Sequence, residues 1–195
     1  MGRNRTIDRD AVLDAAQKVV SRDGAIGLTL DAVAHEAGIS KASVLYDCKT
    51  KQQLIQAVIE RRIARDTERA RDAVSKLGDC PNPSIEALIA SFQSEVSDED
   101  RAVAIHLIAA MAQDNELRAP VQELIASHVR DIRATSATPR GALLAFFALE
   151  GMKLLDWFGL HRCSEAERDQ LIKDIRWLVD QSPGDPPPSP EATHG

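Results

Sequence analysis

Cysteine and aromatic residues are scarce in this 195-residue chain, and each scarcity excludes a class of architecture. The three cysteines, Cys48, Cys80 and Cys163, lie far apart and form no CxxC pair. The sequence therefore indicates neither a disulfide framework nor a zinc site, and it leaves free thiols or a redox sensor as the two interpretations. Aromatic residues make up 4% of the chain, so the core must be built from Leu, Ile, Val and Ala.

Long apolar runs and targeting signals are absent as well. A membrane-spanning helix needs about 18 or more apolar residues in succession, and no stretch of the sequence approaches that length. Residues 1–10 lack the apolar segment of a signal peptide. We therefore expect a cytoplasmic protein with no membrane partner.

Common catalytic motifs are missing too. The sequence contains no Gly-rich phosphate loop, no HExxH, no GxSxG and no Cys–His pair at an informative spacing. The acidic run at 98–100 falls at a predicted helix start, where helix electrostatics explains it. The sequence therefore indicates a protein that is not an enzyme and uses no cofactor or metal ion. Two binding functions stay open, a DNA-binding regulator and a helical protein-interaction module.

Charge is present in quantity but is unevenly distributed. The whole chain has a net charge of −6, yet residues 1–51 hold eight Lys or Arg against seven Asp or Glu. The first quarter of the chain is therefore slightly basic, and the remainder is acidic. This asymmetry suggests an N-terminal segment that faces nucleic acid, carried on an acidic body.

Apolar residues follow the 3.6-residue period in every long segment, which predicts an all-α fold of about nine helices. We expect a helix-turn-helix domain over residues 1–50 and a helical regulatory and dimerisation domain over 51–181. A disordered tail is expected over 182–195, where Pro, Gly and small polar residues dominate. The predicted helices span residues 10–22, 30–37, 41–47, 51–77, 84–94, 98–112, 117–135, 139–158 and 165–180.

Several helix ends are marked by residues with known capping preferences. Gly24 and Gly38 are predicted to end the first two helices in the left-handed conformation. Thr138 is expected to cap a helix that begins with proline. Pro120 is expected in the first turn of the 117–135 helix, where a missing N–H is harmless. Capping boxes are predicted for Thr50 with Gln53, Ser97 with Asp100, and Ser164 with Glu167.

Two short helices joined through Gly38, Ile39 and Ser40 match the helix-turn-helix pattern. In that motif the second helix enters the major groove of DNA with its N-terminal residues first. The candidate recognition helix begins with Lys41, which can reach a guanine edge or a phosphate, and small residues follow it. The predicted DNA-binding residues are Thr29, Ser40, Lys41, Ala42, Ser43, Tyr46 and Lys51.

These residues are suited to different contacts. Thr29 and Ser40, as helix caps, leave backbone N–H groups where a phosphate is favoured. Lys51 places a cation in the first turn of the long helix, an arrangement poor for helix stability and good for anion binding. Tyr46 is the only tyrosine of the chain, and taken alone it is more typical of a packing residue with a solvent-facing hydroxyl.

The segment from residue 6 to about 60 resembles the DNA-binding domain of TetR-family transcriptional repressors. The matching features are the Ala pair in the first helix, the stretch LTLDAVAHEAGISK, and the pattern Y…K-TK--L. The resemblance implies that Tyr46 and Lys51 contact operator phosphates. It places Lys41, Ala42 and Ser43 at or near base edges, and it implies that the remaining chain binds a ligand and dimerises.

Two positions depart from the family pattern. The family usually has an aromatic residue where this chain has Cys48, and often an aromatic residue or His where it has Asp47. A carboxylate at 47 repels phosphate unless it accepts from a cytosine amine or pairs with a nearby cation. Cys48 fills less volume than Phe, so we expect a looser junction into the following helix.

No motif of comparable specificity follows residue 60. Glu150, an acid in an apolar helix, is either a paired carboxylate or the counter-ion of a cationic ligand. His106 lies on an apolar helix, a setting more typical of a hydrogen-bonded core residue than of a ligand contact. The predicted residues of an apolar ligand pocket are Phe92, His106, Met111, Gln113, Phe147, Glu150 and Trp157.

The last two helices, 139–158 and 165–180, are predicted to form a four-helix homodimer interface that includes Phe146 and Leu149. The alternative is that they only seal the core of one subunit. A dimer is favoured because one half-site gives too little specificity. The predicted function is a repressor released from an inverted-repeat operator by a small hydrophobic ligand. The 51–77 helix is the expected connection between DNA and ligand.

Overall fold

The computed structural model describes residues 9–93 and 96–184, and all regular structure within these ranges is helical. This confirms the predicted all-α fold. Most of the predicted tail, from 185 onward, lies outside the described residues. Among the described helices none is both long and apolar enough to cross a membrane. The helices are α1 (Arg9–Gly27), α2 (Leu30–Ala37), α3 (Lys41–Asp47), α4 (Lys51–Lys76), α5 (Pro83–Gln93), α6 (Asp98–Gln113), α7 (Asn115–Thr135), α8 (Pro139–Trp157) and α9 (Glu165–Val179).

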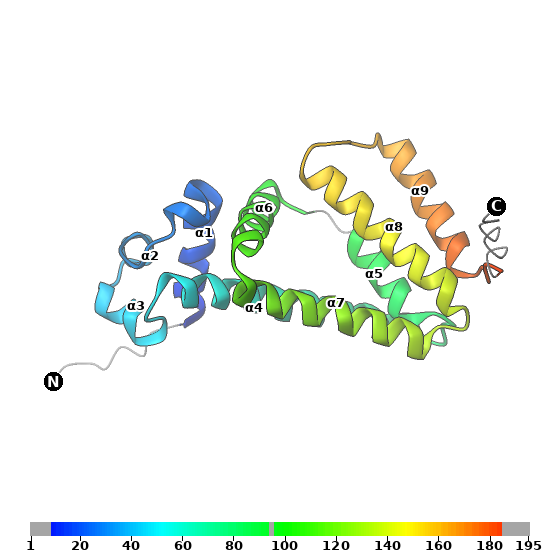
Figure 1. Cartoon of the computed structure of the whole chain (residues 1–195), viewed down its shortest axis with the longest axis horizontal. Helices are drawn as coiled ribbons and strands as arrows, with labels where there is room; N and C mark the ends of the chain where they lie inside the picture. Colours follow the sequence, from blue (N-terminus) through cyan, green and yellow to red (C-terminus); the bar gives the residue numbers. More distant parts are fainter. Residues whose placement is uncertain (1–8, 94–95, 185–195) are drawn as a thin grey trace, which may run out of the picture.

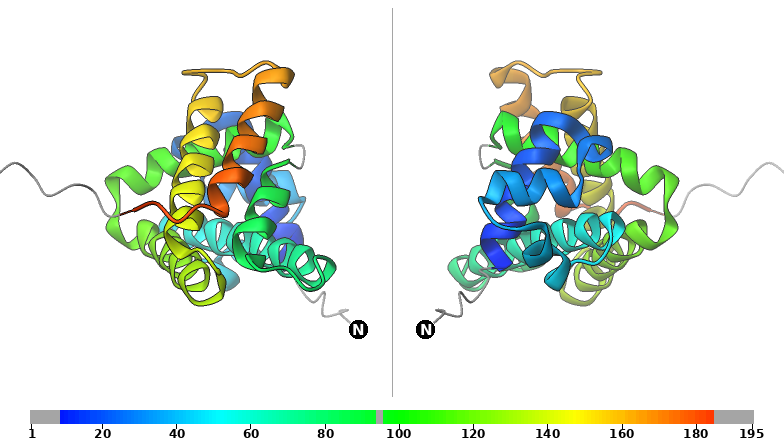
Figure 2. Two further views of the ribbon diagram at one scale, coloured as in Figure 1. Left: turned by 90° about the vertical axis from the view of Figure 1, so that its right-hand side faces the viewer. Right: turned by 90° about the vertical axis from the view of Figure 1, so that its left-hand side faces the viewer.

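The helices are arranged in an elongated molecule with two distinct ends (Figure 1). α1, α2 and α3 form one end, whereas α5, α8 and α9 form the other. α4 and α7 run lengthwise between the ends, and α6 stands beside α1. α8 and α9 lie side by side on the outer surface of the far end (Figure 2, left).

Each end of the molecule is held together by its own cluster of buried side chains. The first cluster is formed by side chains of α1, α2, α3 and α4. Val103 and Leu107 of α6 and Leu117 of α7 complete it. The second joins α5, α7, α8 and α9 around Ile132 and Phe146. Because the first cluster continues beyond residue 50 into three further helices, α4 is not the only element that links α1, α2 and α3 to the rest of the chain. The division of the chain at residue 50 stays a prediction.

Most predicted helix ends are present, with small differences in how they are made. Gly38 ends α2 at a φ of 64°, in the left-handed region that favours glycine. Gly24 also has a positive φ, of 72°, but it kinks α1 rather than ending it, and the helix continues to Gly27. Ser164 and Glu167 form the complete capping box that the sequence predicts.

Four other predicted ends are wrong in detail. In the predicted box of Ser97 with Asp100, the Asp100 carboxylate accepts from the Ser97 hydroxyl and not from the Ser97 N–H. The Asp114 carboxylate caps α7, which therefore begins at Asn115 and places Pro120 beyond the first turn, where it removes a helical hydrogen bond. The Thr138 hydroxyl makes no cap and instead donates to the carbonyl of Val179, which ties the start of α8 to the end of α9. At the start of α4, Gln53 accepts from the N–H of Lys49 rather than completing a box with its cap.

Candidate functional site

The helix-turn-helix corner is fixed by its two caps. The Thr29 hydroxyl accepts from the N–H of Ala32 at 3.0 Å, and the Ser40 hydroxyl accepts from the N–H of Ser43 at 3.2 Å. Between them, the left-handed Gly38 turns the chain, and Ile39 packs against the first core. The start of α3 is therefore held rigidly relative to α2.

Helix α3 has one buried and one exposed face. Val44 and Cys48 at its C-terminal end are buried in the first core. The opposite face exposes Lys41, Ala42, Leu45, Tyr46 and Asp47. Tyr46 is 81% exposed, which excludes the packing role that its sequence alone favoured. The exposed face carries one cation, one phenol, one carboxylate and a short apolar strip.

Lys41 and Lys51 are oriented by contacts with neighbouring elements. The Lys41 ammonium lies 2.8 Å from a carboxylate oxygen of Asp31, and both side chains are exposed. Such a surface ion pair contributes little to stability, so the Lys41 ammonium can leave the Asp31 carboxylate and bind a phosphate instead. The Lys51 ammonium donates to the carbonyl of Ile26 at 2.6 Å, which fixes the start of α4 against the corner between α1 and α2.

The two departures from the family pattern have different structural settings. Burial raises the pKa of the Cys48 thiol, with a smaller opposing effect of Arg9 and a smaller raising effect of Asp47. Cys48 is therefore a packing residue held as a thiol, which is unfavourable for a redox sensor. Asp47 is exposed at the end of α3 beside Tyr46, so its carboxylate lies on the same face as the predicted DNA contacts.

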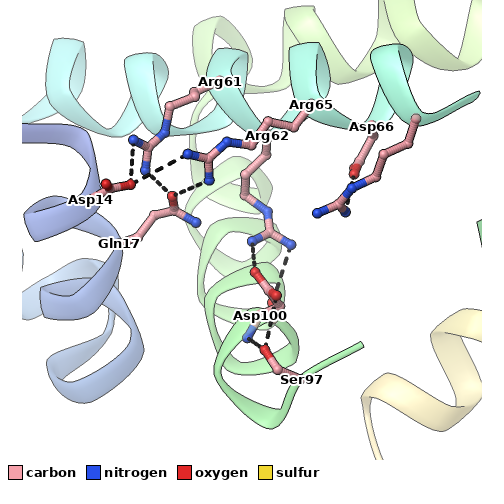
Figure 3. Close-up of polar contacts among 9 residues, drawn as sticks. Asp14, Gln17, Arg61, Arg62, Arg65, Asp66, Ser97 and Asp100 are labelled. Atoms are coloured by element: carbon pink, nitrogen blue, oxygen red, sulfur yellow. Dashed lines mark hydrogen bonds and ion pairs between the residues drawn. The ribbon is translucent and has the colours of Figure 1, made fainter. Parts of the chain in front are cut away.

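Arginines of α4 bind α4 to α1 (Figure 3). The Arg61 guanidinium lies 2.8 Å from an oxygen of Asp14 in α1, donates to the carbonyl of Asp10 at 3.0 Å, and also contacts Gln17. Its side chain is 8% exposed. Arg65 approaches the same Asp14 carboxylate at 3.5 Å. α4 is therefore fixed to α1 by charge-assisted contacts in addition to the shared core.

The next arginine of α4 holds the N-terminus of α6 (Figure 3). Arg62 donates to the Asp100 carboxylate at 3.0 Å and to its carbonyl at 3.3 Å. Asp100 also accepts from the Ser97 hydroxyl, which in turn caps α6. Burial alone would raise the pKa of Asp100, but the hydrogen bonds from Ser97 and Arg62 outweigh it and keep that pKa below its ordinary value.

The predicted ligand-pocket residues fall into separate parts of the molecule. His106 lies against Gly24, because a Cβ added to Gly24 would be 3.2 Å from the Nδ1 atom of His106. Met111 packs against the first cluster. Phe92 packs against the second core. Phe147 is exposed on α8. The structure therefore does not gather the predicted set around one cavity.

The remaining three predicted residues lie at helix surfaces. Gln113 is exposed at the end of α6. Glu150 pairs with Lys153 of the same helix at 2.6 Å, and the Lys153 ammonium lies 5.5 Å from the ring centre of Trp157. Of the two alternatives for Glu150, the structure shows the paired carboxylate.

Neither of two hollows in the described residues is lined by a predicted pocket residue. One, of about 230 Å³, lies between α4, α5 and α7. The other, of about 440 Å³, is an apolar groove on the outer face of α8 and α9. The first is lined by Thr67, Ala70, Arg71, Val74, Ser84, Ala87, Leu88, Leu124, Ser127, His128 and Asp131. The second is lined by Ala148, Met152, Leu171, Asp174, Ile175, Trp177 and Leu178.

Comparison with known families gives two matches that together cover most of the chain. Residues 12–58 match the family described as bacterial regulatory proteins, tetR family. Residues 85–180 match the family described as tetracyclin repressor-like, C-terminal domain. The first match contains the helix-turn-helix corner, and the second contains α5 to α9.

Individual relatives agree with these matches over different lengths. The chain is 36% identical over 90 residues to the HTH-type transcriptional regulator BetI of Agrobacterium fabrum, which is 45% of this chain and 42% of that protein. The chain thus matches less than half the length of this curated relative. A transcriptional regulator from Streptomyces coelicolor A3(2) has a similar structure, with a TM-score of 0.71 at 17% identity, over 89% of this chain and 98% of that one. The multidrug binding protein EbrR, complexed with malachite green, superposes with a TM-score of 0.65 at 20% identity, over 88% and 98%.

Proposed function

Because the chain belongs to the TetR family of bacterial regulatory proteins, we propose that it is a repressor that binds an inverted-repeat operator as a homodimer and leaves it when a small ligand binds. The family consists of DNA-binding transcriptional regulators, not enzymes. Repression, the dimer, the operator symmetry and the release by a ligand are the proposed parts.

The observation that carries the proposal is the one-sided exposure of α3. A helix that buries Val44 and Cys48 presents its opposite face as a unit, which is how a recognition helix enters the major groove. Lys41, Ala42 and Ser43 enter first, and Lys41 reaches a guanine edge or a phosphate. The Tyr46 hydroxyl, far out in solvent, is placed to donate to the DNA backbone.

Phosphate contacts around this helix position it on the duplex. Thr29 and Ser40 cap α2 and α3, so backbone N–H groups at these starts can meet phosphates. Lys51 adds a cation beside the same corner. Since its ammonium already donates to the Ile26 carbonyl, a phosphate would meet a cation that is fixed in position.

The dimer is supported by an apolar face of α8 that the chain does not cover. Phe146 and Leu149, the predicted interface residues, are buried in the core of the single chain, so that part of the prediction is wrong. α8 is apolar on nearly all sides, and its periodicity could not tell the inner face from the outer one. The outer surface carries Phe147, which is 59% exposed, and Trp177 of α9, which is 65% exposed. We propose these two residues for the dimer interface in place of Phe146 and Leu149.

The two glycines of α8 also lie on different faces, one toward the core and one toward the outer surface. A Cβ on Gly141 would overlap the carbonyl oxygens of Leu178 and Gln181, so this glycine serves packing within the chain. A Cβ on Gly151 would meet nothing within 4 Å. Gly151 therefore leaves room on the outer face for a helix of a second subunit. Two copies of α8 and α9 would form the proposed four-helix interface.

Ligand release is proposed because the family contains members that bind small molecules. EbrR, which shares the fold, is a multidrug binding protein complexed with malachite green. A ligand releases DNA only if it binds one arrangement of the two α3 helices better than the other. α4 connects Lys51 at the DNA face with the 230 Å³ cavity, and its arginines also hold α1 and α6.

The experiment that tests the proposed function is selection of binding sites from a pool of random duplexes by the full chain. We expect an inverted repeat whose half-sites lie about one helical turn apart, retained less well as salt is raised. A helical interaction module would give no enriched sequence and no salt-sensitive retention. That outcome would overturn the assignment of DNA binding to α3.

A further inference from the structure

We propose that the cavity between α4, α5 and α7 is a binding site for a small carboxylic acid, which accepts a hydrogen bond from His128 and pairs with Arg71. Its role in release from DNA rests on the proposed function, whereas the binding itself does not. The site differs from the seven residues that the sequence predicts. It also implies an anionic ligand, in place of the cationic one that Glu150 suggested.

The first argument is the state of His128. Within the described residues its side chain makes no hydrogen bond, although it lines the cavity. The Nδ1 atom is fully buried without a partner, and the ring stands edge-on to Phe146 with centroids 6.0 Å apart. Since Nδ1 is closed off, Nε2 is the nitrogen of His128 that can meet a ligand in the cavity.

The protonation of His128 follows from these surroundings. Burial lowers its pKa below the ordinary 6.5; Glu150, Asp131 and Asp66 oppose this shift, whereas Lys153 adds to it. The ring is therefore neutral at pH 7 and carries one proton. A buried N–H without an acceptor is costlier than a buried lone pair, so the proton belongs on Nε2, the nitrogen that is not enclosed. His128 thus offers one donor and selects a ligand with an oxygen acceptor.

The second argument is the charge at the edge of the cavity. Arg71 and Asp131 both line it and both are exposed, so they stand nearer to solvent than His128. Neither makes an ion pair within the part of the chain that the structure describes. The Arg71 guanidinium can bind a ligand carboxylate through two parallel N–H groups. Asp131 and a ligand ammonium cannot form a paired contact of this geometry. Together with the donor on His128, this favours an anionic ligand.

The remaining lining residues set the size and the character of the ligand. Leu88, Leu124 and Val74 give the cavity apolar walls, while Thr67 and Ser84 add hydroxyl groups. The volume of about 230 Å³ corresponds to about seven or eight water molecules. A ring or short chain with one acidic group fills that space, whereas a large dye does not.

The position of the cavity gives the site a route to the DNA face. Thr67, Arg71 and Val74 belong to α4, whose first residue is Lys51. Twenty residues of helix separate Arg71 from Lys51, a length of about 30 Å. A ligand that moves this part of α4 away from α5 or α7 therefore tilts the helix that carries Lys51.

Three probes of similar size and different charge test the proposal: benzoate, benzyl alcohol and benzylamine. Each is titrated into the ¹⁵N-labelled full chain while the amide signals of Leu88, Ser127 and His128 are followed. We expect benzoate to shift these signals saturably, with a Kd at least about tenfold lower than that of either other probe. Tightest binding of benzylamine, lost in Asp131→Asn, would overturn the acid class. No saturable shift with any probe would overturn the site.

Variants separate the two contacts from general effects on folding. Arg71→Met should weaken benzoate about tenfold or more, whereas Arg69→Met, on the same helix but outside the cavity, should not. His128→Gln keeps an N–H donor and should retain binding within about threefold, but His128→Leu should lose it. Equal affinity in all four variants would refute the assignment. DNA selection without a probe keeps the tests apart, because a chain that binds benzoate and selects no DNA retains this site and loses the proposed function.

Discussion

Tyr46, Leu45 and Ala42 are exposed on α3, and in the proposed complex Tyr46 would contact DNA through a different force from Leu45 and Ala42. The Tyr46 hydroxyl can donate a hydrogen bond. Leu45 and Ala42 have no polar atom beyond the backbone, so they can recognise only shape and apolar groups. Lys51, held by the Ile26 carbonyl, supplies full charge beside the same corner. Substitutions at these positions should therefore give different signatures.

Tyr46→Phe and Lys51→Ala should both weaken operator binding, each by on the order of 1 kcal/mol. Lys51→Ala should also lower the slope of log affinity against log salt by about one unit, because one fewer counterion is released. Tyr46→Phe removes a neutral donor and should leave that slope unchanged. Fluorescence anisotropy at several salt concentrations measures both quantities, with Lys173→Ala on α9 as the control. Unchanged affinity in both variants would remove these residues from the interface.

Leu45 and Ala42 should contact the methyl groups of thymines in the major groove. Replacing thymine by uracil removes that methyl and leaves base pairing intact. We expect at least one thymine per half-site whose replacement weakens wild-type binding about threefold or more, and weakens Leu45→Ala much less. If every uracil duplex binds both proteins equally, the apolar strip does not read bases.

His128 should make stability depend on pH. Its pKa in the folded chain lies below the ordinary 6.5, so the unfolded chain binds more protons as the pH falls through that value. The free energy of unfolding should therefore fall as the pH drops below about 6.5, and His128→Gln should reduce that fall. Urea unfolding at pH 7.5 and at pH 5.5 measures it. An identical pH dependence in the variant would show that His128 does not contribute.

The exposed residues and the helix caps of the helix-turn-helix corner were predictable, because this motif sets the local geometry of about twenty consecutive residues. The exposure of Tyr46 and the caps at Thr29 and Ser40 follow from that short range. The cavity was not predictable, since α4, α5 and α7 supply its lining from three segments far apart in sequence. His128 itself carried no local signal that its Nδ1 would be left without a partner.

At the scale of elements, α4 runs from the end that carries α3 toward the opposite end of the molecule (Figure 1). It begins at the DNA face, holds α1 through Arg61 and α6 through Arg62, and then borders the cavity through Arg71. Its periodicity predicted a long amphipathic helix, which is confirmed. Which of its arginines would be buried against other helices depends on the tertiary arrangement, so the sequence could not show it.

Asp14→Ala should destabilise the fold by on the order of 1 kcal/mol, because it leaves the largely buried Arg61 guanidinium without its carboxylate. The matched control is Asp66→Ala, whose partner Arg69 is exposed, and it should stay within about 0.5 kcal/mol of the wild type. Chemical denaturation of both variants gives the comparison. Equal effects would mean that the contact between α1 and α4 adds nothing to the shared core.

At the scale of the whole molecule, each end has its own buried cluster, and α7 contributes to both clusters through Leu117 and Ile132. The end formed by α1, α2 and α3 presents the recognition helix, and the opposite end presents the outer faces of α8 and α9 (Figure 2). If two chains join through these outer faces, two copies of α3 can meet one duplex. The all-α architecture was predictable from periodicity, whereas the choice between the inner and outer faces of α8 required the structure.

The most direct test of the account is a hydroxyl-radical footprint of the full chain on its selected operator. We predict two protected patches on one face of the duplex, about 34 Å apart, with two chains bound per site by sedimentation. The doubly substituted Phe147→Glu, Trp177→Glu chain should keep its helical circular dichroism, sediment as a monomer and lose both patches at the same concentration, since a charge on the outer face opposes association. A single patch with one chain bound, or no protection at all, would contradict the account.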